Sequence, residues 1–231
     1  GDDPYLIVAN SGQPVDADDT RALTTIGDTT KRDAERKATI GHKGRGFSAV
    51  LEITEQPYVF STDVSFMFDR EHSRDCISEV IGEVDEWSMD DIAGIPLMRL
   101  PFAPDQCPER VETLLAGKYE TAFYFPLRAD AVADVQQSLE ALDAQTVLFL
   151  QNLGQLEIDI NESVTTWDVA RRETPIETVN STVDLVEIQR ESEHVDNRTY
   201  LQFARNELPL GEHTAGISNN TWGEITETQV S

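Results

Sequence analysis

The stretch of sequence that decides the fold is IGHKGRGFSAVL, at residues 40–51. Glycines alternate with cations in its first part: Gly41, Lys43, Gly44, Arg45 and Gly46. Such glycines leave backbone N–H groups uncovered and tolerate positive φ angles, so the loop can wrap around an oxyanion. The apolar residues that follow have helical spacing. A glycine loop that leads into a helix N-terminus is a common phosphate-binding arrangement.

The order of these glycines, GxxGxG, separates the loop from other nucleotide-binding loops. It lacks the Gly-Lys-Ser/Thr end of the P-loop and differs from the GxGxxG of dinucleotide folds and kinases. By itself the pattern fits a flexible turn before a core helix equally well. The choice between the two depends on the sequence that precedes the loop.

Two segments upstream of the loop favour the nucleotide site. The first, YLIVANSGQP at residues 5–14, predicts a buried strand that ends in a polar turn. The second, IGDTTK at residues 26–31, follows a predicted helix at residues 16–26 that has Asp16 as its expected N-cap.

In this order the three segments resemble the ATP-binding domain shared by Hsp90 chaperones, DNA gyrase B subunits, sensor histidine kinases and MutL proteins (the GHKL, or Bergerat-fold, superfamily). Within it, the pattern is most similar to the sacsin-type ATP-binding domain. The resemblance implies an α+β fold over residues 1–160, a two-layer sandwich in which a mixed, mostly antiparallel sheet carries helices on one face. Residues 161–231 alternate polar and β-branched side chains, which predicts an antiparallel β-rich extension or the start of a following domain.

The resemblance also implies roles in ATP binding. Asn10 corresponds to the residue that accepts the adenine amino group, and Gly12 lets the backbone pass close to the base. Residues 27–39 correspond to a lid over the nucleotide. Ser61 falls at a position that holds an adenine-bound water, and Thr121 at a small polar position on a late strand. The residues implied to contact ATP are Asn10, Gly12, Lys31, Gly41, Lys43, Gly44, Arg45, Gly46, Ser61 and Thr121.

Each of these features also has a purely structural interpretation. Residues 10–12 fit an ordinary Asx turn, and residues 27–39 fit a solvated loop. The hydroxyls of Ser61 and Thr121 fit simple β-propensity. The sequence does not decide which of the two cations in the glycine loop faces the phosphates.

One expected part of the site is missing from the sequence. In the resembling family, the catalytic glutamate and the asparagine that binds Mg²⁺ lie on a helix before the first strand, but only five residues precede Leu6. We therefore expect a fragment that does not hydrolyse ATP and whose affinity for the nucleotide is weakened, and we assign it no catalytic residue and no metal ligand. Whether the intact protein is an ATPase would depend on that helix.

The leading hypothesis is the ATP-binding domain of a larger, chaperone-like protein, in which lid closure over ATP drives a conformational switch. The alternative is a non-catalytic interaction or scaffold module that keeps the fold. A histidine kinase fits less well, because no helical segment carries a phospho-acceptor histidine. The expected partners are ATP or ADP and an unknown protein client or fused domains.

Strands and helices further along the chain are predicted from hydrophobic periodicity. Strands are expected at residues 57–61, 64–68, 121–127, 156–160, 164–169, 179–188 and 199–204, and an amphipathic helix at 131–143. Residues 71–110 are rich in proline and are predicted to be irregular, apart from an edge strand at 95–100.

Composition restricts the functional classes. The chain has 18 basic and 43 acidic residues, a formal charge of −25, and its cations include only four lysines. This balance suits a cytoplasm with molar salt and predicts a halophilic source; a cationic partner is the alternative. It also argues against direct binding to nucleic acid.

Cysteine usage and hydropathy indicate neither a metal site nor a membrane protein. Cys76 and Cys107 have no CxxC partner, so neither a zinc site nor a disulfide framework is indicated, and the spacing of His72 to Cys76 fits no standard zinc pattern. No apolar run reaches the length of a membrane span and no signal peptide is recognised, so a cytoplasmic location is expected.

The halophile hypothesis predicts that refolding yield rises with KCl concentration, because counter-ions screen the repulsion among the acidic side chains. The measurement is the recovery of far-UV circular dichroism after dilution from urea into a series of KCl concentrations. Full stability in low salt would contradict the hypothesis.

Overall fold

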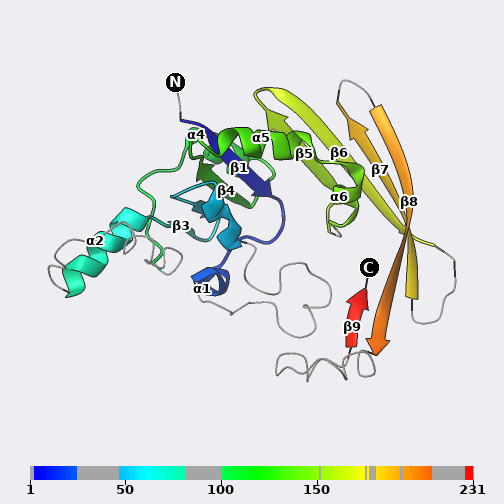
Figure 1. Cartoon of the computed structure of the whole chain (residues 1–231), viewed down its shortest axis with the longest axis horizontal. Helices are drawn as coiled ribbons and strands as arrows, with labels where there is room; N and C mark the ends of the chain where they lie inside the picture. The colour runs from blue at the N-terminus through cyan, green and yellow to red at the C-terminus, as the bar shows by residue number, and fades with distance from the viewer. Residues whose placement is uncertain are drawn as a thin grey trace. The chain divides into compact units, whose positions relative to one another are not determined.

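The structure is a computed structural model of the 231-residue chain. It describes residues 3–24, 47–81, 100–150, 152–174, 176, 181–192, 195–209 and 227–230. The chain divides into two compact units, residues 1–135 and 136–231, each with its own antiparallel sheet and helices. The fold is therefore α+β (Figure 1).

The sheet of the first unit has four antiparallel strands in the order β1-β4-β2-β3. They are β1 (Tyr5–Asn10), β2 (Tyr58–Ser61), β3 (Ser65–Met67) and β4 (Thr121–Pro126). The predicted hairpin of β2 and β3 is confirmed, with Val59 opposite Phe66. Strand β1 pairs with β4, which is the last of these four strands in the sequence. Strand β4 therefore lies between β1 and β2.

Two helical predictions in the first unit are confirmed. Helix α1 (Ala17–Thr24) begins after Asp16, whose Oδ1 accepts the backbone N–H groups of Asp18 and Asp19 at 2.8 and 2.9 Å. This is the expected N-cap. The helix predicted after the glycine loop is present as the 3₁₀ helix η1 (Phe47–Glu52).

The prediction of an irregular segment at residues 71–110 is wrong at both of its ends. Helix α2 (Arg70–Ile81) occupies the first part, and α4 (Glu109–Ala116) begins directly after Pro108. Helix α2 is mostly polar and so gave little apolar periodicity. Proline is well tolerated at a helix start, where its missing N–H has no intrahelical partner. Residues 95–99 of the predicted edge strand lie outside the described residues.

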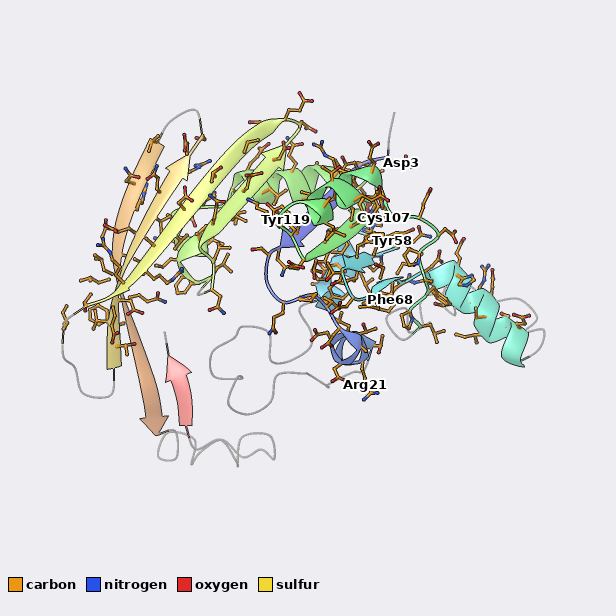
Figure 2. All side chains as sticks on the ribbon, turned by 180° about the vertical axis from the view of Figure 1, so that it is seen from behind. Asp3, Arg21, Tyr58, Phe68, Cys107 and Tyr119 are labelled. Carbon is orange, nitrogen blue, oxygen red and sulfur yellow. The ribbon has the colours of Figure 1, made fainter. Side chains whose placement is uncertain are left out.

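Apolar side chains are buried on both faces of this sheet. On one face, Val59, Phe66 and Phe68 pack with side chains of α1 and η1; Phe68, labelled in Figure 2, is fully buried. On the other, Phe60 and Ala122 pack against Val111 of α4. In the described part of this unit, helical elements therefore cover both faces, whereas the sequence led us to expect helices on one face only.

The sheet of the second unit is a five-stranded meander in the order β5-β6-β7-β8-β9. The strands are β5 (Gln155–Ile160), β6 (Ser163–Glu173), β7 (Ser181–Glu191), β8 (Val195–Pro209) and β9 (Glu227–Val230). The predicted antiparallel β-rich segment is confirmed. The strand predicted at residues 156–160 is also present, and it pairs with β6 in this second sheet.

One face of the meander carries the core of the second unit. Trp167 and Val169 of β6 and Val186 and Ile188 of β7 are buried there with Val147 of helix α6 (Ala144–Leu148).

The helix predicted at 131–143 is present as α5 (Val132–Glu140). No helix in the described part of the chain has the length and apolar character needed to cross a membrane.

We predict that Ile188→Ala lowers the free energy of unfolding by about 2–5 kcal/mol, because it opens a cavity beside a side chain that is only 2% exposed. The matched control is Leu201→Ala on the neighbouring strand, where the side chain is 52% exposed and the expected change is about 0.5 kcal/mol or less. Urea denaturation measures both. Equal effects of the two variants would contradict the assignment of this core.

Candidate functional site

The ends of three adjacent strands bring together three residues that the sequence singled out. Asn10 is the last residue of β1 and lies opposite Thr121, the first residue of β4. Thr121 in turn lies opposite Ser61, the last residue of β2. Residues from three distant parts of the sequence therefore form one row across the sheet.

The hydroxyls of Ser61 and Thr121, which we call the hydroxyl pair, hold the turn that follows β1. The backbone N–H of Val15 donates to Ser61 Oγ at 2.9 Å and, less closely, to Thr121 Oγ1 at 3.3 Å. Ser61 Oγ donates to the carbonyl of Glu120 at 3.2 Å, and the two hydroxyl oxygens lie 3.2 Å apart. Because the single proton of Ser61 goes to Glu120, we assign Thr121 as the donor between the two hydroxyls.

Burial makes this network structurally important. Ser61 is 8% and Thr121 1% exposed, so water has little access to either hydroxyl. A buried hydroxyl without a partner costs free energy. The resemblance implied that Ser61 holds an adenine-bound water and that Thr121 is a small polar residue of the site; the structure shows that both hydroxyls anchor the turn at Val15 to β2 and β4. No pattern in the sequence could have shown the role of the Val15 backbone amide.

Asn10 presents an exposed side chain at the end of β1. Its backbone carbonyl accepts the N–H of Glu120 at 2.9 Å, which fixes the strand end. Among the described residues, its side-chain amide makes no hydrogen bond. A Cβ added at Gly12 would lie 3.1 Å from Asn10 Nδ2, so glycine at that position leaves room for the amide. The arrangement leaves the NH₂ group as a donor of up to two hydrogen bonds and the carbonyl oxygen as an acceptor for a ligand.

The glycine loop and the lid lie outside the described residues, with all their predicted ligand contacts: Lys31, Gly41, Lys43, Gly44, Arg45 and Gly46. The residues on either side of this segment are described. Leu23 of α1 precedes it, and Phe47 and Leu51 of η1 follow it. All three pack against the same buried cluster as Val15, and the Phe47 ring lies 5.6 Å from that of Phe123 on β4. The described residues on both sides of the segment therefore pack on the same face of the sheet as Val15 of the turn after β1.

The described part of the chain contains no cluster of metal-ligating side chains. No group of three or more His, Cys, Asp or Glu side chains there is placed to hold a metal ion. On α2, Cys76 Sγ lies 3.8 Å from His72 Nε2, and the pair has no third ligand nearby among these residues.

Comparison with known proteins identifies the family. A family model described as the Sacsin domain matches residues 2–166, which include β1, β4, the hydroxyl pair and the glycine loop. Because the match covers more than half of the chain, the protein belongs to the Sacsin domain family. No curated protein and no solved structure gave a significant match.

We predict that Ser61→Ala lowers the free energy of unfolding by about 1–3 kcal/mol, because Val15 N–H and the Glu120 carbonyl both lose a buried partner. Denaturant unfolding measures this loss, and amide hydrogen exchange at Val15 should become faster. The control is Thr62→Ala at the adjacent exposed position, with an expected change of about 0.5 kcal/mol or less. Unchanged exchange at Val15 in Ser61→Ala would show that the hydroxyl does not hold the turn.

Proposed function

We propose that the first unit is an Hsp90-like (GHKL) ATP-binding domain of the sacsin type, and that it acts as an ATP-dependent switch in a larger, chaperone-like protein. The observation that carries the proposal is the row of Asn10, Thr121 and Ser61 across β1, β4 and β2. Three of the residues that the resemblance implies for ATP binding thus lie at neighbouring strand ends, which supports the proposal. Membership of the Sacsin domain family supports the same function.

Adenine would bind at the end of β1. The Asn10 side-chain carbonyl would accept the adenine N6–H, and its NH₂ group would remain for a ring nitrogen or a water. The fit is supported by the exposed amide of Asn10 and by the space left beside it at Gly12. Since the hydroxyl pair anchors the turn between Gly12 and α1, it would also maintain the conformation of the adenine-binding site.

The triphosphate would be held by the glycine loop. Backbone N–H groups of Gly41, Gly44 and Gly46 suit phosphate oxygens, and Lys43 and Arg45 supply positive charge. This local charge matters because the chain carries a net charge of −25, which opposes the approach of any polyanion. Mg²⁺ would arrive with the nucleotide and neutralise part of the phosphate charge.

Switching would follow from a difference in affinity between nucleotide states. The lid segment at residues 27–39, with Lys31, would close over ATP more favourably than over ADP, because only ATP offers a γ-phosphate. A ligand shifts a conformational equilibrium only by its differential affinity for the two states. We assign this chain no hydrolytic residue.

A non-catalytic scaffold module is the second candidate function. The observation in its favour is that the hydroxyl pair is buried and already hydrogen-bonded within the protein. In that case the site would be a structural remnant of the fold, and the chain would bind protein partners without nucleotide.

Calorimetric titration of the chain with ATP and ADP, each with Mg²⁺, distinguishes the two functions. We expect Gly44→Val to abolish ATP binding, since its side chain would occupy the place of a phosphate. Asn10→Ala should weaken ATP binding about tenfold through loss of a buried hydrogen bond in the complex. It should leave stability unchanged, because the side chain is exposed.

The matched control for these variants is Gly154→Ala in the second unit, where an added Cβ would meet nothing within 4 Å. It should bind ATP as the parent chain does. No ATP binding by the parent chain, or equal binding by Gly44→Val, would contradict the nucleotide site and favour the scaffold function.

A further inference from the structure

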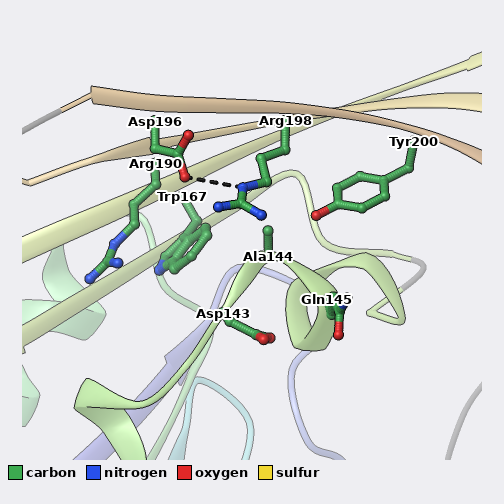
Figure 3. A pocket seen from close by; sticks show the side chains of 8 residues that line it. All are labelled: Asp143, Ala144, Gln145, Trp167, Arg190, Asp196, Arg198 and Tyr200. Carbon is green, nitrogen blue, oxygen red and sulfur yellow. Dashed lines mark hydrogen bonds and ion pairs between the residues drawn. The ribbon is translucent and has the colours of Figure 1, made fainter.

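The second unit has a pocket of about 250 Å³ between α6 and strands β6, β7 and β8 (Figure 3). It lies within this unit and shares no residue with the candidate nucleotide site. Its wall combines aromatic rings with charged groups: Asp143, Trp167, Arg190, Asp196, Arg198 and Tyr200. A charged group that is not paired within the protein is available to a ligand.

Within the described part of the chain, the guanidinium of Arg190 has no hydrogen-bond acceptor, unlike that of Arg198, the other cation of this pocket. The Cζ of Arg190 lies 5.0 Å from the centre of the Trp167 ring, and its buried Nε has no hydrogen-bond partner. Among the residues that the structure describes, Arg190 makes no ion pair. The Trp167 ring is itself only 3% exposed, so the guanidinium rests on a fixed surface.

Two other arginines of this sheet have guanidinium groups with acceptors inside the protein, although the buried Nε of Arg171, like that of Arg190, has no partner. The Nη atoms of Arg171 donate to the carbonyls of Leu148, Leu150 and Leu153 at 2.9 to 3.1 Å and so tie the end of α6 to β6. Arg198 donates from Nε to Asp196 at 3.1 Å (dashed in Figure 3). The Nη or Nε atoms of both therefore donate within the protein, whereas the guanidinium of Arg190 has no acceptor among the residues that the structure describes.

The two carboxylates limit the charge of a ligand. Asp143 Oδ1 accepts the backbone N–H and the hydroxyl of Thr146 at 2.8 and 2.9 Å. These hydrogen bonds, the backbone one foremost, lower the pKa of Asp143, so it is ionised at neutral pH. Asp196 is paired with Arg198. A dianionic phosphate would be repelled by both carboxylates, while a group with a single charge would meet less repulsion.

We propose that this pocket binds a ligand that carries a single carboxylate, which Arg190 receives. The planar guanidinium matches a carboxylate in shape and charge. Tyr200 and the rim around Ala144 would contact the rest of the ligand. A free small carboxylate and the C-terminus of a peptide share this chemistry. The proposal does not depend on the nucleotide site.

Calorimetry on the full chain tests the proposal with four probes: benzoate, the tripeptide N-acetyl-Ala-Ala-Phe as its free acid, the same tripeptide as its C-terminal amide, and inorganic phosphate. We expect at least one of the two carboxylates to bind at millimolar concentration or below. Binding of benzoate alone identifies a small-molecule site, and binding of the free-acid peptide alone identifies a peptide C-terminus. Equal binding of the acid and amide peptides, tighter binding of phosphate, or no binding by either carboxylate overturns the proposal.

Variants of Arg190 locate the binding in this pocket. Arg190→Met keeps an apolar stem over Trp167 and removes the charge, so we expect the carboxylate to bind about tenfold more weakly or worse. Arg190→Lys keeps the charge but loses the planar fork, and it should give an intermediate loss. Arg172→Met is the control, because Arg172 is exposed, pairs with Glu187 and points to the opposite face of β6 from Trp167.

Circular dichroism confirms that each variant is folded before binding is measured. If Arg190→Met does not fold, the loss in Arg190→Lys relative to Arg172→Met decides the matter. Unchanged affinity in the folded Arg190 variants, or an equal loss in Arg172→Met, overturns the assignment of Arg190.

Discussion

The hydrogen bond from the Val15 amide to Ser61 Oγ is the interaction on which the candidate site of the first unit depends. It joins the turn after β1 to β2, and through Thr121 and Glu120 it reaches β4. The hydroxyls of Ser61 and Thr121 are buried, and buried polar groups must be paired. The hydrogen bond to Ser61 holds Val15 in this turn, between the end of β1, which the Glu120 N–H to Asn10 carbonyl hydrogen bond fixes, and the start of α1, which Asp16 caps.

The order of strands explains why such an anchor is needed. Strand β1 lies at the edge of the described sheet and pairs only with β4, which is more than a hundred residues later in the chain. The turn after β1 must cross towards β2 to reach α1, whose apolar side chain Leu23 packs on the same cluster as Val59. The hydroxyl pair stands where this crossing occurs. The site therefore lies at the ends of three strands that are hydrogen-bonded side by side.

Charge has a different role in each unit. In a chain with a net charge of −25, exposed arginines are commonly paired with carboxylates close in sequence, as in Arg74–Asp75, Arg128–Asp130 and Arg198–Asp196. Exposed pairs of this kind contribute little to stability. Their effect is to neutralise the positive charge of each arginine locally. Arg190 differs from these pairs, because its guanidinium lies on an aromatic ring and has no acceptor among the described residues.

The sequence by itself determined the features that depend on near neighbours in the chain. Alternation of apolar and polar residues predicted the β2–β3 hairpin and the later meander. Asp16 predicted the start of α1 as its N-cap. The order of the glycine motifs indicated the sacsin-type family. Only the tertiary structure decided that Ser61 and Thr121 meet the amide of Val15, that β5 joins the second sheet, and that Arg190 lies on Trp167 without an acceptor. The physical reason is that local periodicity records which face of an element is buried, whereas contacts between distant strands depend on register and packing, which no short stretch of sequence contains.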